Sequence, residues 1–174
     1  MNILSITTKT NNSFFKQHLC KLNIKFNIEY LTTPTINYCK YILDYELSDN
    51  NMYIKEYIGF QKPKIIKLYL LKCECAVLYM GINKQLLTVP DNSLFIKYDV
   101  CFSDSSNMIY FNYTPDSIRF LTTWEYLCNW PKFAKVDNYK LLMLVKSFFE
   151  NENRCNTTDN KCVFGQLSQF VEFL

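Results

Sequence analysis

Residues Met108–Cys128 read MIYFNYTPDSIRFLTTWEYLC, and this stretch places a strand directly before a helix. Apolar residues alternate through Met108–Thr114, which is typical of a half-buried strand. Pro115 and Asp116 then open a helix, with Asp116 as its N-cap. The side chains expected to be buried on this helix recur at helical spacing: Ile118, Leu121, Trp124 and Leu127. A strand that leads into a helix in this way predicts a domain that contains both kinds of element.

The flanking sequence extends this pattern in both directions. We expect strands over 23–30, 36–47, 65–80 and 94–102, a helix that begins after Asn11–Ser13, and a further helix over Asn138–Glu150. Val163–Leu174 is a last apolar segment that also favours a helix. Because the strands are grouped in mid-chain with helices outside them, the sequence predicts an α+β fold. We expect a mostly antiparallel sheet with helices packed on one face, and a C-terminal helical extension.

The chain has 174 residues, which fits one domain with a sizeable core. No internal repeat divides it, so we predict a single domain over 1–174. Its α+β core would span 1–133, and the extension would span 134–174. The abundance of Asn, Ile, Lys, Phe and Tyr indicates an A/T-rich genome, such as that of a mitochondrion, a large DNA virus or a parasite.

The composition speaks against several kinds of catalytic site. Three glycines are too few for the repeated close backbone approach of a phosphate-binding glycine loop. His18 is the one histidine, so a His-based triad or relay cannot form within the chain. No pair of carboxylates has a spacing that suggests glycosidase chemistry, and Glu74 is expected to face outward from a strand. We therefore expect no enzyme activity, no cofactor and no small-molecule substrate.

Eight cysteines leave two interpretations open. Most lie in apolar runs, where a reduced thiol behaves as a small hydrophobic group. Since Met1–Thr10 has no apolar signal segment, reduced and buried cysteines are the favoured interpretation. The alternative is a four-cysteine zinc site, whose spacing matches no common zinc module: Cys73, Cys75, Cys155 and Cys162. No apolar run is long enough to span a membrane, so we expect no membrane partner.

The most informative polar segment is a basic stretch around Gly59–Pro63. It contains several lysines next to a predicted Gly/Pro loop, and such lysines are well placed to meet phosphates. Nearby aromatic rings could stack on bases. The alternative is an ordinary solvated loop, and the net charge of +3 permits RNA contact without demanding it. The residues that we expect to contact RNA are Lys55, Gln61, Lys62, Lys64 and Lys67.

Gly59-Phe60-Gln61-Lys62-Pro63-Lys64-Ile65-Ile66 resembles the Gly-Gln-Lys-Pro-x-Ile-Thr segment of the large-subunit ribosomal protein family that binds 5S ribosomal RNA in the central protuberance. Other patches follow the order of that family. Thr33–Ile36 is similar to the start of its first strand, and Trp130-Pro131-Lys132-Phe133 resembles the end of its final helix. The resemblance covers residues 14–133 in patches. It lacks the family's Gly-rich middle loop, and it carries one extra residue, Phe60.

The resemblance implies a structural part of the mitochondrial large ribosomal subunit, which contacts ribosomal RNA and neighbouring ribosomal proteins. An alternative is a host-interaction protein of an A/T-rich DNA virus that acts in the host cytoplasm through protein–protein binding. An enzyme of an unrecognised class is a third hypothesis, for which a deep pocket lined by Cys, Lys and Glu would be the supporting sign.

Overall fold

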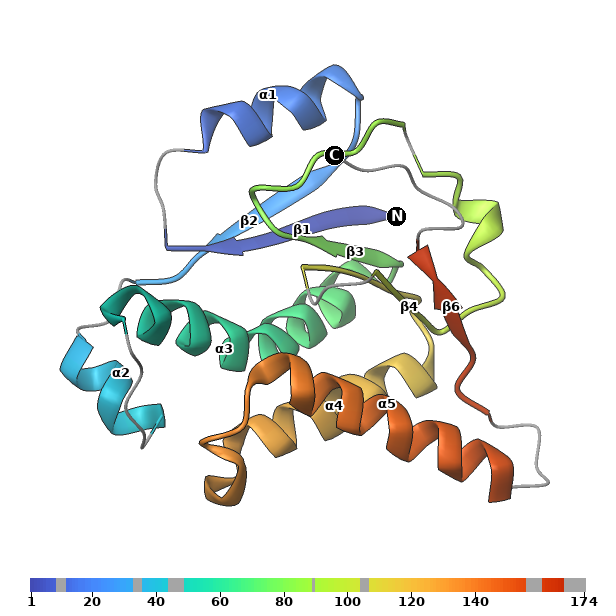
Figure 1. The fold of residues 1–174 in the computed structure, drawn as a ribbon. Helices are drawn as coiled ribbons and strands as arrows, with labels where there is room; N and C mark the ends of the chain where they lie inside the picture. The colour runs from blue at the N-terminus through green and yellow to red at the C-terminus, as the bar shows by residue number, and fades with distance from the viewer. Residues whose placement is uncertain are drawn as a thin grey trace.

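A computed structural model describes residues 1–8, 12–32, 36–43, 49–88, 90–103, 107–155 and 161–167. Its centre is a six-stranded sheet with helices around it (Figure 1). The strands are β1 (Asn2–Thr7), β2 (Phe26–Tyr30), β3 (Val77–Met80), β4 (Val100–Phe102), β5 (Met108–Phe111) and β6 (Phe164–Gln166). The helices are α1 (Ser13–Lys21), α2 (Ile36–Leu43), α3 (Asn50–Cys73), α4 (Pro115–Asn129) and α5 (Asn138–Cys155), with short 3-10 turns at Asn92–Leu94 and Pro131–Phe133.

The order of strands across the sheet is β2-β1-β3-β5-β4-β6. β1 pairs in parallel with β2 on one side and with β3 on the other. β5 runs antiparallel to both β3 and β4, and β6 is parallel to β4. The chain therefore leaves β1 in one direction across the sheet to form β2, and then returns to the other side of β1 to form β3.

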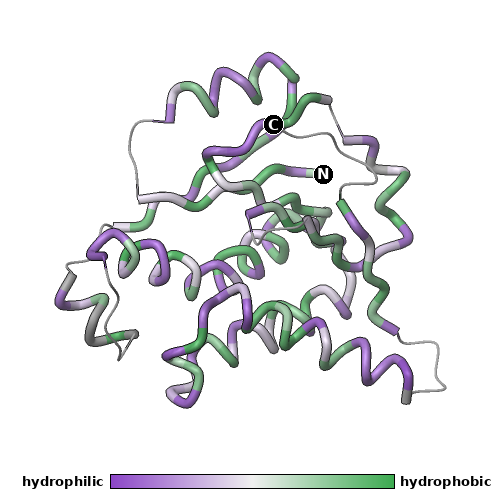
Figure 2. Tube along the Cα trace, in the orientation of Figure 1, coloured by the Kyte–Doolittle hydropathy of each residue, from purple (hydrophilic) through white to green (hydrophobic). Residues whose placement is uncertain are grey.

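Each face of the sheet has its own hydrophobic core. On one face, α1 contributes Phe15 and Leu19 to a cluster with Ile3 and Leu78. On the other face, α3, α4 and α5 cover a larger cluster that includes Leu4 and Tyr79. Figure 1 shows α1 on the side of the sheet opposite to these three helices. The hydropathy along the chain in Figure 2 alternates in α1, which has one face in the core and one in water.

β1 forms because Asn2-Ile-Leu-Ser-Ile-Thr7 is a short apolar run that is buried on both faces. Strands that are covered on both sides show such continuous burial instead of alternation. β3 is likewise buried at every position. These two neighbouring parallel strands form the middle of the fold, and their ends position the site described below.

The predicted α+β class is confirmed, but two of its details are wrong. The sheet is mixed, with three parallel and two antiparallel pairings, where we expected it to be mostly antiparallel. The helices cover both faces of the sheet, where we expected one covered face. β1, which was not predicted to be a strand, makes two of the three parallel pairings, and α1 covers the second face.

Two predicted strands are helical. Residues 65–73 belong to α3, and only Val77–Met80 of the predicted 65–80 strand is extended. Ile36–Leu43 is the helix α2, and 44–47 lie outside the described residues. By contrast, helices were predicted correctly where α1, α4 and α5 occur. The N-cap of α4 is Thr114, whose Oγ1 accepts a hydrogen bond from the N–H of Ser117, and Pro115 and Asp116 follow in the first turn.

The region predicted as a C-terminal extension contributes directly to the core. α5 buries Leu141, Leu142, Val145 and Phe149 against the other helices. β6 joins the sheet beside β4, where the N–H of Val163 donates to Asp99 Oδ2. The predicted helix over 163–174 is thus a strand in its described part, and 168–174 lie outside the described residues.

Candidate functional site

A cleft of about 760 Å³ opens at the carboxyl ends of β1 and β3. Its floor comes from Thr7, at the end of β1, and from Gly81–Lys84, which follow β3. One wall is the first half of α3, and the start of α5 closes the cleft at Asn138. In open α/β sheets, ligands bind outside the carboxyl ends of the strands, at the point where the strand order reverses. This cleft lies at that point, because the strand order reverses between β1 and β3.

Lysines line the cleft at two depths. Lys55 on α3 is exposed, and Lys84 after β3 is half-buried. Lys62 lies deeper, where it is only 7% exposed, and its Nζ is 5.1 Å from the centre of the Tyr79 ring. Burial lowers the pKa of Lys62 to about 8, although the nearby carboxylate of Glu56 opposes this shift. These three lysines outnumber the two carboxylates of the lining, Glu56 and Asp137, so the cleft has an excess of positive charge that suits an anionic ligand.

Two acceptors in the same cleft lack hydrogen-bond partners among the described residues. They are Glu56 Oε2 on α3 and Oδ1 of Asn138 at the start of α5. Asn138 is 5% exposed, and its Nδ2 lies 3.4 Å from Cys128 Sγ. Burial raises the pKa of Glu56, and the negative charge of Asp137 raises it further. Buried acceptors in native proteins nearly always have a donor, so this end of the cleft is suited to a ligand that supplies one.

Gly59 brings α3 and α5 together beside these acceptors. A Cβ atom at position 59 would lie 3.1 Å from Asn138 Cβ and 3.3 Å from Asn138 Cγ. The absence of a side chain there allows Asn138 to approach the backbone of α3 closely. Asn138 is therefore held in place by packing on Gly59 and by its amide contact with Cys128.

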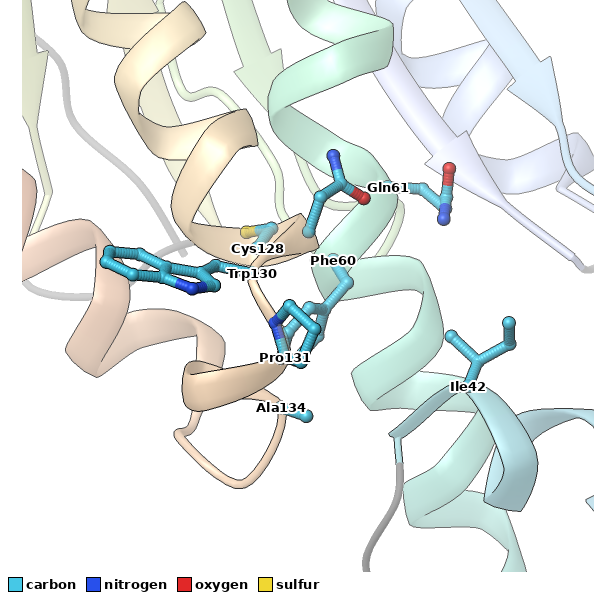
Figure 3. Close-up of a pocket in the computed structure, with 8 residues that line it drawn as sticks. Ile42, Phe60, Gln61, Cys128, Trp130, Pro131 and Ala134 are labelled. Atoms are coloured by element: carbon cyan, nitrogen blue, oxygen red, sulfur yellow. The ribbon is translucent and has the colours of Figure 1, made fainter.

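A second, smaller hollow of about 370 Å³ lies between α2, α3 and the end of α4 (Figure 3). Apolar side chains such as Ile42, Phe60 and Pro131 make up much of its lining, together with the amides of Gln61 and Asn129. Its ionisable group is the Cys128 thiol, and burial raises the pKa of that thiol to about 12. A thiol that stays protonated at neutral pH is a poor nucleophile, so the larger cleft is the better candidate for chemistry.

The residues that we expected to contact RNA do not share one surface. All five lie on the helix α3 instead of on a loop, because Gly59 and Pro63 are accommodated within that helix. Lys55 and Lys62 line the cleft, whereas Gln61 lines the second hollow. Lys67 forms an ion pair with Glu125 of α4, and Lys64 is exposed. The predicted basic loop before a strand is therefore wrong, and its lysines point to different neighbours.

The cysteine, histidine and glutamate side chains considered in the sequence analysis do not form a metal centre or a proton relay. Among the residues that the structure describes, no three His, Cys, Asp or Glu side chains gather in a way that could hold a metal ion. Cys73 ends α3 instead of lying in a strand, and Glu74 follows as its C-cap with a positive φ of 48°. His18 Nε2 lies 2.8 Å from the carbonyl oxygen of Leu86. No helix within the described ranges is both long enough and apolar enough to cross a bilayer.

Sequence reasoning missed most of the cleft. Glu56, Asn138 and Gly81–Lys84 carried no recognised motif, since they come from separate elements that only the sheet topology brings together. The available signal was the pair of short apolar runs, Asn2–Thr7 and Val77–Met80, each followed by small or polar residues. Interpreted as two buried parallel strands, these runs would have indicated a site at their ends.

Comparison with known proteins gives the fold a counterpart. No protein-family model matches the chain, and no curated protein sequence matches it significantly. A solved structure does: the crystal structure of a glycosyltransferase involved in the glycosylation of the major capsid of PBCV-1. The TM-score is 0.58 at 9% sequence identity, over 95% of this chain and 80% of the glycosyltransferase.

This likeness corrects the predicted role. A structural part of the mitochondrial ribosome is wrong as a function for this chain, because the fold it shares is that of a glycosyltransferase. The patchy sequence resemblance to the ribosomal family, and the mitochondrial or viral origin, stay predictions. The solved structure that it resembles is that of an enzyme, which does not agree with the expectation of no enzyme activity. At 9% identity, what it shows is a fold shared with a glycosyltransferase over nearly the whole chain.

Proposed function

We propose that this chain is a glycosyltransferase that binds a sugar donor with a phosphate leaving group, such as a nucleoside diphosphate hexose. The observation that carries the proposal is the cleft at the reversal between β1 and β3, with Lys55, Lys62 and Lys84 in its lining. Its volume of about 760 Å³ lies in the range of small-molecule sites. The shared fold of a glycosyltransferase supports the same class of reaction. The proposal departs from the expectation of no small-molecule substrate.

The chemistry needs few groups from the protein. The bond between the anomeric carbon and the phosphate oxygen breaks, and the phosphate leaves with the electron pair. An acceptor hydroxyl oxygen forms the new bond to that carbon, and its proton passes to a carboxylate. Asp137 is the exposed carboxylate of the cleft and is suited to that proton transfer. The lysines stabilise the negative charge that develops on the leaving phosphate.

Binding is the first test. Uridine, guanosine and thymidine diphosphate hexoses would be titrated into the protein by isothermal titration calorimetry. We expect one of them to bind, and Lys55→Met and Lys84→Met each to weaken it about tenfold, since a hydrogen bond to a charged group contributes about 1.5–3 kcal/mol. Lys64→Met is the matched control, because Lys64 is exposed on the same helix and does not line the cleft.

Transfer is the second test. The best-bound donor would be incubated with the protein, with and without a panel of sugar acceptors, and release of the nucleoside diphosphate would be followed by NMR. We expect the nucleoside diphosphate to be released only when the protein is present. We expect the release to be slower with the Asp137→Asn variant. Failure of all three nucleotide sugars to bind at millimolar concentration would contradict the proposed function, and so would binding that Lys64→Met weakens as much as Lys55→Met.

A further inference from the structure

We propose that Glu56 and Asn138 form a subsite that accepts hydrogen bonds from the hydroxyl groups of a sugar ring in the bound ligand. This inference rests on the proposed function and specifies which part of the ligand the inner wall of the cleft recognises. Glu56 comes from α3 and Asn138 from the start of α5, so the subsite spans the contact between these two helices.

The two orphaned oxygens are the first support. Glu56 Oε2 and Asn138 Oδ1 are both shielded from solvent, both belong to cleft residues, and neither has a hydrogen-bond partner among the described residues. A buried acceptor without a donor destabilises the fold, and the cost is larger for a charged group. Two such acceptors in one cleft indicate a ligand that brings donors to both.

The surrounding charge selects the kind of donor. Lys62 and Lys55 lie close enough to Glu56 to affect its pKa, so they disfavour a second cation, such as a ligand amine. A phosphate offers acceptor oxygens and would be repelled by the carboxylate. A hydroxyl donates to an ionised Glu56, and it can equally accept from Glu56 in its protonated form. Hydroxyl groups therefore fit this end of the cleft in either state of the carboxyl group.

The subsite is also held rigidly. The backbone N–H of Asn138 lies close enough to Glu56 to lower the pKa of its carboxyl group, so the two residues are neighbours. The Asn138 side chain packs on Gly59 at 3.1 Å from the position of a Cβ atom there, and its Nδ2 contacts Cys128 Sγ. A binding group whose position is fixed by packing loses less entropy when the ligand binds. Such fixation is typical of a residue that recognises one group in one place.

Two parts of a nucleotide sugar carry hydroxyls, the hexose and the ribose. The experiment measures the dissociation constants of the nucleotide sugar that binds most tightly and of its bare nucleoside diphosphate. The proteins are the wild type, Glu56→Gln, Asn138→Ala and the control Glu74→Gln. Glu74 is exposed at the far end of α3, about 27 Å from Glu56 at 1.5 Å per residue. If hexose hydroxyls occupy the subsite, we expect both cleft variants to bind the nucleotide sugar about tenfold more weakly and the bare nucleoside diphosphate as tightly as the wild type does.

If ribose hydroxyls occupy the subsite, the same variants bind both ligands about tenfold more weakly than the wild type does. A parallel series changes the ligand instead of the protein, so it does not depend on the folding of a variant. The wild type is titrated with the 2′-deoxyribose form and with the 2-deoxyhexose form of the nucleotide sugar. We expect one of the two to bind about tenfold more weakly than the parent nucleotide sugar. Unchanged affinities in the variants and in the deoxy series would overturn the subsite and leave the proposed function standing. A wild type that binds no nucleotide sugar would overturn both.

Discussion

At the scale of single residues, Lys62 is a lysine buried in the lining of the cleft. It lies on α3 with 7% of its surface exposed, beneath the carboxyl ends of two buried strands. Burial disfavours the charged form of the ammonium group, and this desolvation is the main reason that the pKa of Lys62 falls to about 8. A group that destabilises the fold and lines a cleft is better explained by ligand binding than by packing.

We therefore expect Lys62→Met to raise stability and to weaken binding. Below pH 8 the lysine is charged in the folded and unfolded chains alike, so the folded wild type carries the full cost of desolvation. Removing the charge should stabilise the fold by about 3 kcal/mol at pH 7. The measurement is urea unfolding of both proteins, with calorimetry on a nucleoside diphosphate hexose, whose affinity should fall about tenfold or more.

The pH dependence separates this cause from a simple packing effect. Between pH 8 and 10.5 the unfolded wild type still holds a proton that the folded wild type has released, so its stability rises relative to the variant. The advantage of Lys62→Met should be constant below pH 8 and should shrink across that interval. A difference that does not change with pH would show that the charge is not the cause.

At the scale of elements, α3 is the helix that organises the site. It contacts α2, α4, α5, β1 and β3, so its buried residues are not confined to one stripe. Pro63 lies in its interior and cannot donate to the carbonyl of Gly59 one turn earlier. That turn is also where Gly59 meets Asn138. The packing of α3 and the shape of the cleft are thus linked at Gly59, because Asn138 packs there and closes the cleft.

Gly59→Ala tests this coupling. Alanine favours a helix by about 1 kcal/mol, but its Cβ would lie 3.1 Å from Asn138 Cβ, which sits on the backbone of α5 and cannot turn aside. Overpacking costs about 1–3 kcal/mol, so we expect a net loss of about 1 kcal/mol and a weaker affinity for the nucleotide sugar. Thermal unfolding and calorimetry measure the two effects.

Gly81→Ala is the control for stability. A Cβ at position 81 would meet Asn107 at 3.6 Å, an ordinary contact, and Gly81 does not have a positive φ. Its melting temperature should stay close to that of the wild type. A Gly59→Ala protein that is more stable than the wild type and binds as tightly would show that α5 moves freely, against a fixed Asn138.

The same helix explains what the sequence could and could not predict. α4 has a capped start and one apolar stripe, so its pattern at 115–129 determines its structure. α3 contains Gly59 and Pro63, which normally end helices, and its surroundings compensate for both. The strand expected over 65–80 failed for this reason: Ile66 and Leu70 pack in the core from a helix, and the exposed Leu68 and Leu71 extend the apolar run beyond the buried face. Local sequence propensity predicted a strand for this segment, whereas its tertiary contacts favour a helix.

At the scale of the whole molecule, the site depends on topology more than on any motif. Residues separated by up to 132 positions, from Ile6 to Asn138, line one cleft because β1 and β3 are parallel neighbours. The sequence drew attention to the lysines near Gly59, and two of them do line the cleft. Their partners could not be predicted, because β1 was missed and the reversal of strand order at β1 was missed with it.

Hydrogen–deuterium exchange would locate the ligand on the whole chain without any substitution. A nucleotide sugar in the cleft should slow exchange in the first half of α3, over Gly81–Lys84, and at the start of α5, since these segments line it. Backbone amides of α4 and β6 should exchange as in the free protein, because neither element contributes to the cleft. Mass spectrometry of peptic peptides, with and without the bound nucleotide sugar, measures each segment separately. Slower exchange centred on Cys128–Ala134 would instead place the ligand in the second hollow, and the assignment of the active site would have to move there.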